Sequence, residues 1–286
     1  ALQQTRAVVP PEAQLITIGD RESDLFALFE QARTLEVDLL VRAAQNRSVC
    51  APEVGRLWAV MGRQAVCGQL QVLVAARQGK PRRQALVSVR FAPVRLQAPR
   101  HLRKTMGAIS LYAVLVQEEA PPPDSTPLCW LLLTTVSVHN FAEAVERIRW
   151  YGLRWQIEVY HKVLKSGCCV EKAQLAHVER LLPYLALLSI IAWRLFWMTL
   201  LARHAPEASC TLVLAAHEWR ALYAFHHRTQ QVPARPPTVG QVVLWIARLG
   251  GFLARKNDGP PGVTVLWRGW QRLSDIAAAW LAFHPS

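Results

Sequence analysis

The order of the apolar segments constrains the fold of this 286-residue chain more than any other feature. Residues 15–19 form a short apolar run that ends at Asp20, the stretch up to residue 34 carries apolar side chains at helical spacing, and 37–44 is a second apolar run. Short apolar runs bounded by polar residues are typical of strands. The chain therefore opens as strand, helix and strand, which is the local order of an α/β domain.

The pattern changes to β-rich runs between residues 54 and 138. Turn signals rich in Gly, Pro and charged residues separate these runs. The runs lie at 69–77, 85–96, 109–117 and 128–138. Because their length and composition fit strands, we expect a β-rich insertion between two α/β pieces.

Helical patterns fill the remainder of the chain. The first covers 141–166 with Asn140 as its N-cap. Later helical stretches cover 176–203, 210–226, 238–254 and 268–283. The sequence therefore predicts an α/β fold in four segments: a partial core at 1–53, the β-rich insertion at 54–138, a helix followed by core helices at 139–203, and a helical C-terminal region at 204–286.

The chain is strongly basic, with 33 Lys and Arg against 20 Asp and Glu and a net charge of +13. An excess of this size favours a polyanionic partner, and nucleic acid is the first candidate. Loops of the β-rich region contribute basic side chains that we expect to face DNA, the alternative being simple solvation. These are Lys80, Arg82, Arg83, Arg100, Arg103 and Lys104.

Cysteine spacing and hydropathy indicate the compartment. The six cysteines show neither a CxxC pair nor a Cys/His ligand spacing, so we expect buried cytosolic thiols and no zinc site. The first 14 residues lack the regions of a signal peptide. Pro183 and Arg194 interrupt the most apolar stretch, Leu181–Leu201, which is predicted to be a core helix. We expect a cytoplasmic protein without membrane contact.

Polar side chains share one face of the helix predicted over 141–166. On an ideal helix Tyr151, Arg154, Glu158 and Lys165 fall within an arc of about 60°, and Lys162 lies at its edge. The neighbouring sector is apolar and is expected to face the core: Trp150, Leu153, Ile157, Tyr160 and Leu164. One carboxylate among several cations favours a functional face, and the alternative is a solvated face with spaced ion pairs.

Asp20 and Glu158 are the candidate catalytic carboxylates. Asp20 follows a strand, where α/β proteins commonly place chemistry, and Glu158 lies on the basic face. Two converging carboxylates can hold divalent metal ions against a phosphodiester. Periodicity alone does not bring these two residues together.

Two motifs in order carry a resemblance to a known family. Tyr151-x2-Arg154-x3-Glu158-x6-Lys165 resembles the YREK signature of bacterial insertion-sequence DDE transposases, and DRESD at 20–24 is similar to their DREAD stretch. The resemblance is to the insertion-sequence-four family, which includes the transposon-five type enzyme. Further similar segments are CWLLLTT (129–135), RWQIEVYHKVLKSG (154–167) and LGGFLARKNDGPPGVTVLWRGWQRL (249–273), so the resemblance spans most of the chain.

This resemblance implies a ribonuclease-H-like catalytic core with a β-rich insertion, followed by a helical C-terminal domain. It implies a transposase that cleaves and joins DNA at transposon ends through two Mg²⁺ or Mn²⁺ ions, with Asp20 and Glu158 as catalytic metal ligands. The implied DNA contacts are Arg42, Tyr151, Arg154, Lys162 and Lys165 on phosphates and Trp130 on a flipped base. For Trp130 the alternative is a buried strand aromatic, and Trp155 is expected to pack.

The chain departs from the family pattern at the first catalytic Asp, which has no counterpart before Asp20. The family's N-terminal end-recognition helices have no counterpart either. We therefore expect an N-terminally truncated transposase. The alternative is a non-catalytic remnant that binds DNA or a full-length transposase without cleaving.

Family members pair, so a homodimer on double-stranded DNA, both transposon ends and target, is the implied assembly. We expect the last helix to serve this pairing through an apolar face, unless that face docks on its own chain. The face comprises Val265, Leu266, Trp267, Trp270, Leu273, Ile276, Trp280 and Leu281.

Overall fold

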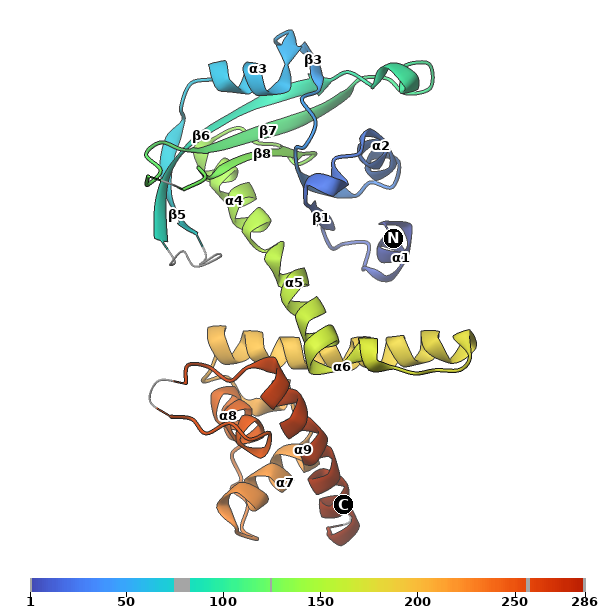
Figure 1. The fold of residues 1–286 in the computed structure, drawn as a ribbon, viewed down its shortest axis with the longest axis vertical. Coiled ribbons are helices and arrows are strands. Elements are labelled where there is room, and N and C mark those ends of the chain that lie inside the picture. Colours follow the sequence, from blue (N-terminus) through green and yellow to red (C-terminus); the bar gives the residue numbers. More distant parts are fainter. Residues whose placement is uncertain (1, 75–82, 124, 256–257, 285–286) are drawn as a thin grey trace. The chain divides into compact units, whose positions relative to one another are not determined.

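The computed structural model describes residues 2–74, 83–123, 125–255 and 258–284 (Figure 1). The chain divides into two compact units, Ala1–Arg154 and Trp155–Ser286, called unit 1 and unit 2 below. Unit 1 is built on a mixed sheet, and unit 2 is helical. This arrangement confirms a mixed α/β part followed by a helical C-terminal part.

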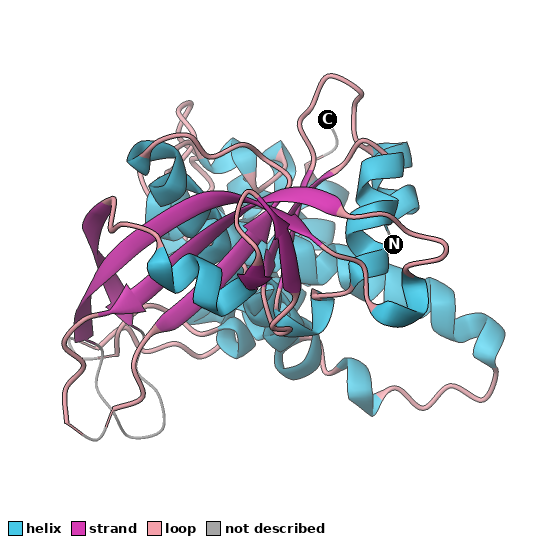
Figure 2. Cartoon of the chain, turned by 90° about the horizontal axis from the view of Figure 1, so that it is seen from above, coloured by secondary structure: helices cyan, strands magenta, loops and turns pink. Residues whose placement is uncertain are grey.

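One twisted sheet contains the described strands of unit 1 (Figure 2). Its order is β1-β2-β8-β7-β6-β3-β4, with β5 paired to β6. Only β1 and β2 run parallel among these pairs. The strands are β1 (Ile16–Gly19), β2 (Asp38–Arg42), β3 (Ser48–Ala51), β4 (Gly55–Arg56), β5 (Gly68–Val74), β6 (Arg83–Leu96), β7 (Ile109–Glu118) and β8 (Cys129–Thr134).

Helices cover both faces of this sheet. They are α1 (Leu2–Val8), α2 (Phe26–Thr34), α3 (Leu57–Arg63) and α4 (Phe141–Gly152), with short 3₁₀ turns at Arg21–Ser23 and Arg100–Leu102. Successive strand residues point to opposite faces. Leu39 therefore packs with residues of α2 and α3, whereas Leu40 packs with residues of α4.

The structure has a strand in each of the expected stretches 15–19, 37–44, 69–77, 85–96, 109–117 and 128–138, although the second and the last are shorter than expected. Residues 75–77 of the third stretch lie outside the described residues. The strands of the 54–138 segment do not form a sheet of their own. Instead, β8 pairs with β2 in register Arg42↔Leu132, and β3 pairs with β4 across the expected boundary at 53/54. Backbone hydrogen bonding of β2 thus requires β8 as its neighbour, which joins both segments in one core.

The single helix expected over 141–166 is interrupted, and that expectation is wrong. The helix α4 closes when Leu153 N donates to Trp150 O and Arg154 N donates to Tyr151 O, at 2.9 and 3.0 Å. The glycine at 152, a poor helix former, lies at this break. A new helix, α5 (Trp155–Lys162), follows and leads into a π-type segment, Val163–Gly167.

The break also changes the apolar sector expected along this segment. Leu153 and Ile157 are exposed by 50% and 48%, so they are not core residues in this structure. Trp155, for which a packing role was expected, is likewise exposed. The positions calculated around one ideal helix do not apply to residues on both sides of the break. The helix α4 packs on the sheet, whereas Tyr160 of α5 packs in the core of unit 2.

Unit 2 packs long helices around one core. After the π-type segment come α6 (Val178–His204), α7 (Ala216–His227), α8 (Val239–Leu249) and α9 (Val263–Phe283), with 3₁₀ turns at Val170–Lys172 and Cys210–Leu212. Arg194 of α6 lies 4.3 Å over the Trp270 ring of α9, and its Nη2 donates to Glu218 of α7 at 2.7 Å. The charge inside the apolar α6 segment is therefore neutralised within the unit.

The apolar face expected on the last helix is mostly used within its own unit. Leu266, Trp270 and Leu273 are buried against α7 and α8. The exposed apolar side chains at the end of α9 are Leu281 and Phe283. The alternative in which this face docks on its own chain therefore holds for the buried part.

Two further expectations differ from the structure. Cys168 and Cys210 are buried as expected, but Cys50 and Cys67 are exposed thiols. By length and composition alone α6 could cross a membrane, a test that core helices of soluble proteins also pass. Only 33% of its most apolar window is buried, so a large part of its apolar surface faces outward.

Candidate nucleic-acid and metal-binding site

Three predicted site residues meet at one edge of the unit 1 sheet. The parallel strands β1 and β2 end together there, since Gly19 pairs with Val41, and so bring Asp20 and Arg42 to the same edge. The antiparallel β8 starts at this edge, and Arg42 Nη2 donates to Cys129 O at 2.9 Å. Trp130 follows Cys129, so unit 1 by itself places a carboxylate, a guanidinium and an indole at this edge.

A second arginine at this edge, Arg21, was missed by the sequence analysis. Burial raises the pKa of the Cys129 thiol, while the positive charges of Arg42 and Arg21 oppose that rise. Both guanidinium groups therefore lie close enough to Cys129 to affect the pKa of its thiol. The available signal was its position inside the DRESD stretch, directly after Asp20.

Trp130 and Tyr151 lie against each other. Their ring centroids are 5.2 Å apart in an edge-on arrangement with an interplanar angle of 66°. Tyr151, in the last turn of α4, is buried, whereas Trp130 is half-buried on the same face of the sheet. Because one part of Trp130 stays accessible, both the stacking role and the packing role expected for it are compatible with this position.

Asp20 and Asp24 of the DRESD stretch have different surroundings. Asp20 Oδ1 accepts a hydrogen bond from Glu22 N at 3.0 Å and caps the 3₁₀ turn. Asp24 is 3% exposed, and its oxygens accept from the backbone N–H groups of Ala44 and Gln45 and from the Arg47 guanidinium, at 2.7 to 3.1 Å. Asp24 is therefore a structural clamp between this turn and the segment after β2.

The remaining predicted residues lie after Tyr151. Arg154 ends unit 1 and is half-buried, while Glu158, Lys162 and Lys165 belong to unit 2 and are exposed. Lys165 Nζ lies 3.0 Å from Glu171 Oε1 in an ion pair with both side chains exposed. A pair of this kind contributes little to stability and can exchange for a phosphate contact.

The described carboxylates do not supply the ligand set of a two-metal centre by themselves. Two divalent ions in one site need several oxygen ligands, some of them shared. Among the described residues no group of three or more His, Cys, Asp or Glu side chains is placed to hold an ion. Asp38, like Asp24, is occupied, because it accepts from Gln14 Nε2 and Thr135 Oγ1, both at 2.8 Å.

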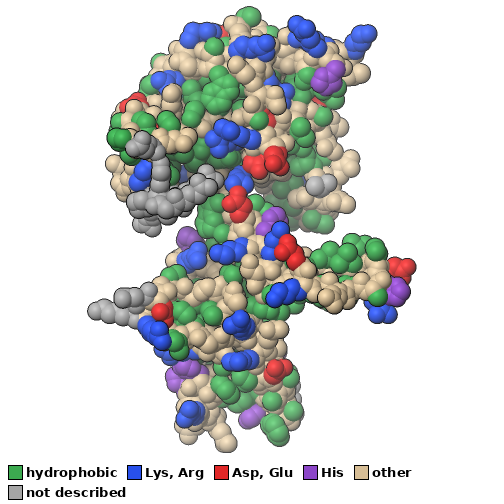
Figure 3. All heavy atoms as spheres, in the orientation of Figure 1, with side chains coloured by type: hydrophobic (Ala, Val, Ile, Leu, Met, Phe, Trp, Pro, Cys, Tyr) green, Lys and Arg blue, Asp and Glu red, His purple; other side chains and the backbone are tan. Residues whose placement is uncertain are grey.

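The basic loops differ in how their side chains are used. Arg83 forms an ion pair with the buried Glu118, so its guanidinium is held inside unit 1. Arg103 donates to Ala98 O and Gln97 Oε1, both at 3.1 Å. Arg100 and Lys104 are exposed, and Lys80 and Arg82 lie outside the described residues. Basic side chains are also scattered over the surface of both units (Figure 3).

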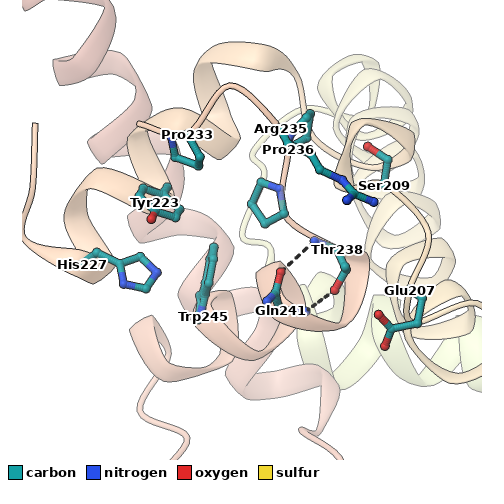
Figure 4. A pocket seen from close by; sticks show the side chains of 11 residues that line it. Glu207, Ser209, Tyr223, His227, Pro233, Arg235, Pro236, Thr238, Gln241 and Trp245 are labelled. Atoms are coloured by element: carbon teal, nitrogen blue, oxygen red, sulfur yellow. Dashed lines mark hydrogen bonds between the residues drawn. The ribbon is translucent and has the colours of Figure 1, made fainter. Parts of the chain in front are cut away.

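A separate cavity of about 650 Å³ lies within unit 2 (Figure 4). Tyr223, His227 and Trp245 form an aromatic side, and the segment 233–238 runs along the other. The centroids of the Tyr223 and His227 rings are 4.3 Å apart. Thr238 and Gln241 cap the N-terminus of α8 with reciprocal hydrogen bonds, since Thr238 N donates to Gln241 Oε1 and Gln241 N donates to Thr238 Oγ1. This cavity separates the 233–238 segment from α7 and α8 and contains none of the predicted site residues.

The end of α6, α7, α8 and most of α9 lie within a segment that matches a protein-family model. The matching family model is described as the Transposase Tn5 dimerisation domain and covers residues 190–280. Residues 190–280 of unit 2 are therefore similar to the dimerisation domain of Tn5-type transposases, and the match supports a transposase-related function. It does not extend to the sheet of unit 1 or to the YREK residues.

Proposed function

We propose that this chain is the DNA-binding and catalytic part of a DDE transposase that acts on transposon ends. The observation that carries the proposal is the sheet edge at which Asp20, Arg42 and Trp130 meet, together with the dimerisation-domain match in unit 2. A carboxylate beside a guanidinium and a partly accessible indole offers a metal ligand, a phosphate ligand and a stacking surface. In this proposal unit 1 is a ribonuclease-H-like core.

The proposal assigns duplex DNA to the basic surface. Arg42, Arg154, Lys162 and Lys165 contact phosphates, and Tyr151 supports Trp130 where it meets the DNA end. A net charge of +13 strengthens binding at low salt and weakens it as counterions compete. Two copies act together, which agrees with the matched domain.

Mg²⁺ or Mn²⁺ belongs to this proposal, with Asp20 and Glu158 as ligands. Such ions polarise phosphate oxygens and activate the attacking hydroxyl or water. Because Asp24 and Asp38 are engaged in structural hydrogen bonds, the further carboxylate that two ions require is assigned to a segment outside residues 1–286. The protein in this proposal is therefore a truncated form of a longer transposase.

The salt dependence of DNA binding tests the phosphate contacts. Arg42→Ala should lower the slope of log K against log salt by about one unit, because one phosphate contact is lost. The matched control is Arg33→Ala, since Arg33 is an exposed arginine of the same unit paired with Glu30. A slope equal to that of the unchanged chain for Arg42→Ala would remove Arg42 from the DNA interface.

A second candidate function is DNA binding without cleavage. The incomplete set of carboxylates among the described residues favours it for residues 1–286 alone. It predicts the same salt dependence and no nicking of transposon-end DNA in Mg²⁺.

A further inference from the structure

The cavity of unit 2 has the dimensions of a small-molecule site. Its volume of about 650 Å³ lies inside the range of about 300–1,000 Å³ that is typical of ligand pockets. Such pockets combine apolar and aromatic walls with a few convergent polar groups. The lining residues fall between Glu207 and Trp245, so unit 2 forms this cavity, and the proposed function gives it no role.

An aromatic wall and a proline wall face each other across the cavity. Tyr223 and His227 come from the last turns of α7 and Trp245 comes from α8, while the segment 233–237 carries the prolines on the other side (Figure 4). Trp245 is 8% exposed, and the ring of His226 stacks on it with centroids 4.9 Å apart and an interplanar angle of 23°. The aromatic wall is therefore fixed in place, and a planar ring fits between the two walls.

The charges around the cavity are mostly positive. Burial lowers the pKa of His226, and the positive charges of His227 and Arg248 lower it further. Arg235 adds a guanidinium to the lining, against the single carboxylate of Glu207. A positive potential of this kind disfavours a cationic ligand and favours an anionic one.

Polar groups gather at the end of the cavity away from the aromatic rings. Figure 4 shows the Arg235 side chain on the side of Ser209 and Glu207. All three residues are exposed, so this end opens to solvent. A guanidinium binds phosphate oxygens, a serine hydroxyl donates to them, and a carboxylate accepts from a sugar hydroxyl.

We propose that this cavity binds one nucleotide unit, with the base between the aromatic wall and the proline wall and the phosphate on Arg235. The same chemistry is offered by a free mononucleotide and by an unpaired nucleotide of a DNA strand. The inference goes beyond the proposed function and does not rest on it, because it needs neither the sheet edge of unit 1 nor cleavage.

Calorimetric titration of the full chain with dAMP tests the site. One dAMP should bind per chain, and inorganic phosphate should bind at least about tenfold more weakly, because it lacks the base that stacks on the aromatic wall. His227→Ala and Arg235→Ala should each raise the dissociation constant of dAMP at least about fivefold. Both side chains are exposed, so both variants should unfold at the temperature of the unchanged chain.

Matched controls use exposed residues of the same unit that do not line the cavity. His204→Ala and Arg228→Ala should leave the dissociation constant of dAMP within about twofold of its original value. The inference is overturned if dAMP does not bind, if the two cavity variants bind it as well as the unchanged chain does, or if a proline-rich peptide binds in its place.

Fluorescence anisotropy with two DNA duplexes distinguishes the two sources of the nucleotide. If the source is a DNA strand, a duplex with a single-stranded tail should bind more tightly than a blunt duplex, and His227→Ala should remove the difference. If the source is a free nucleotide, the two duplexes should bind equally while dAMP still binds. Arg42→Ala should leave dAMP binding unchanged, so failure of the proposed DNA interface in unit 1 is seen separately from failure of this site.

Discussion

Asp24 illustrates at the residue scale how a motif residue can serve the fold. Its carboxylate accepts hydrogen bonds from Ala44, Gln45 and Arg47 and is shielded from water. Asp24→Asn removes the charge that pairs with Arg47, and we expect the free energy of unfolding to fall by about 3 kcal/mol. Urea unfolding of the full chain, followed by circular dichroism, measures this loss.

Asp20→Asn is the matched control for that change. Asn caps a helical turn about as well as Asp, so unfolding should change by less than about 1 kcal/mol. Equal urea midpoints for Asp24→Asn and the unchanged chain would contradict the clamp.

Glu118 gives unit 1 a stability that depends on pH. The Arg83 guanidinium, and with it the Leu128 N–H group, lowers the pKa of Glu118 below its ordinary value of 4.5, although burial acts in the opposite direction. A carboxylate with a lowered pKa stabilises the fold above its unfolded pKa and loses this contribution as pH falls through the folded pKa. The stabilisation is therefore complete at neutral pH and declines below about pH 4.5.

Glu118→Gln tests this pH dependence. At pH 7 the variant should lose about 2 kcal/mol of unfolding free energy, and the difference from the unchanged chain should shrink as pH falls below about 4.5. Glu119→Gln, an exposed neighbour, should show no such trend. A difference that stays constant from pH 7 to pH 3 would exclude the Arg83 pair as its cause.

At the element scale, two glycines allow α8 and α9 to touch at the backbone. A Cβ added at Gly269 would lie 1.8 Å from Ile246 O, and one added at Gly250 would lie 1.8 Å from Val265 O. Gly269→Ala should therefore separate the two helices and destabilise unit 2 by more than the usual 1–3 kcal/mol of an overpacked core, roughly 3 kcal/mol or more.

Thermal unfolding of the full chain measures the Gly269→Ala effect. Gly262→Ala is the control, because Gly262 precedes α9 and an added Cβ there meets nothing within 4 Å. If both variants unfold at the same temperature, the close contact of α8 with α9 does not limit stability.

The sequence predicted the strands well but not the interrupted helix. The length and the apolar pattern of runs such as 109–117 are enough to predict a strand from the local sequence. The break after Gly152 depends on which body each half packs against, and that information lies in other parts of the chain. The shared polar face expected from Tyr151 to Lys165 assumed one continuous helix, and the break between α4 and α5 interrupts it.

The candidate site was predictable only in part, for a similar reason. Asp20 directly follows the strand predicted at 15–19, and Arg42 lies near the end of the strand predicted at 37–44, so the parallel pairing of these two strands places both residues at one edge. The pairing of β2 with β8, which brings Trp130 there, joins segments far apart in the sequence and leaves no local signal. The structural role of Asp24 was hidden as well, because its partner Arg47 lies beyond β2.

At the scale of the whole molecule, the two units carry complementary parts of the proposed function. Unit 1 holds the sheet edge with Asp20, and unit 2 holds Glu158 and the matched dimerisation domain. Cleavage in the proposed function therefore depends on both units at once, whereas DNA binding depends mainly on total positive charge. These two activities should separate in experiments on residues 1–286.

Residues 1–286 should bind duplex DNA without nicking it. Two ions in one site need more carboxylates than Asp20 and Glu158 provide, and the oxygens of Asp24 and Asp38 are occupied. Weakly held metal cannot stabilise both the attacking and the leaving oxygen, so several kcal/mol of transition-state stabilisation are lost. Incubation with end-labelled transposon DNA in Mg²⁺ or Mn²⁺ should leave the strands intact.

A longer chain that supplies the further carboxylate should cut, and Glu158→Gln in that chain should abolish cutting with little change in DNA affinity. Cleavage by residues 1–286 alone that Glu158→Gln abolishes would mean that another acidic residue of this chain completes the site.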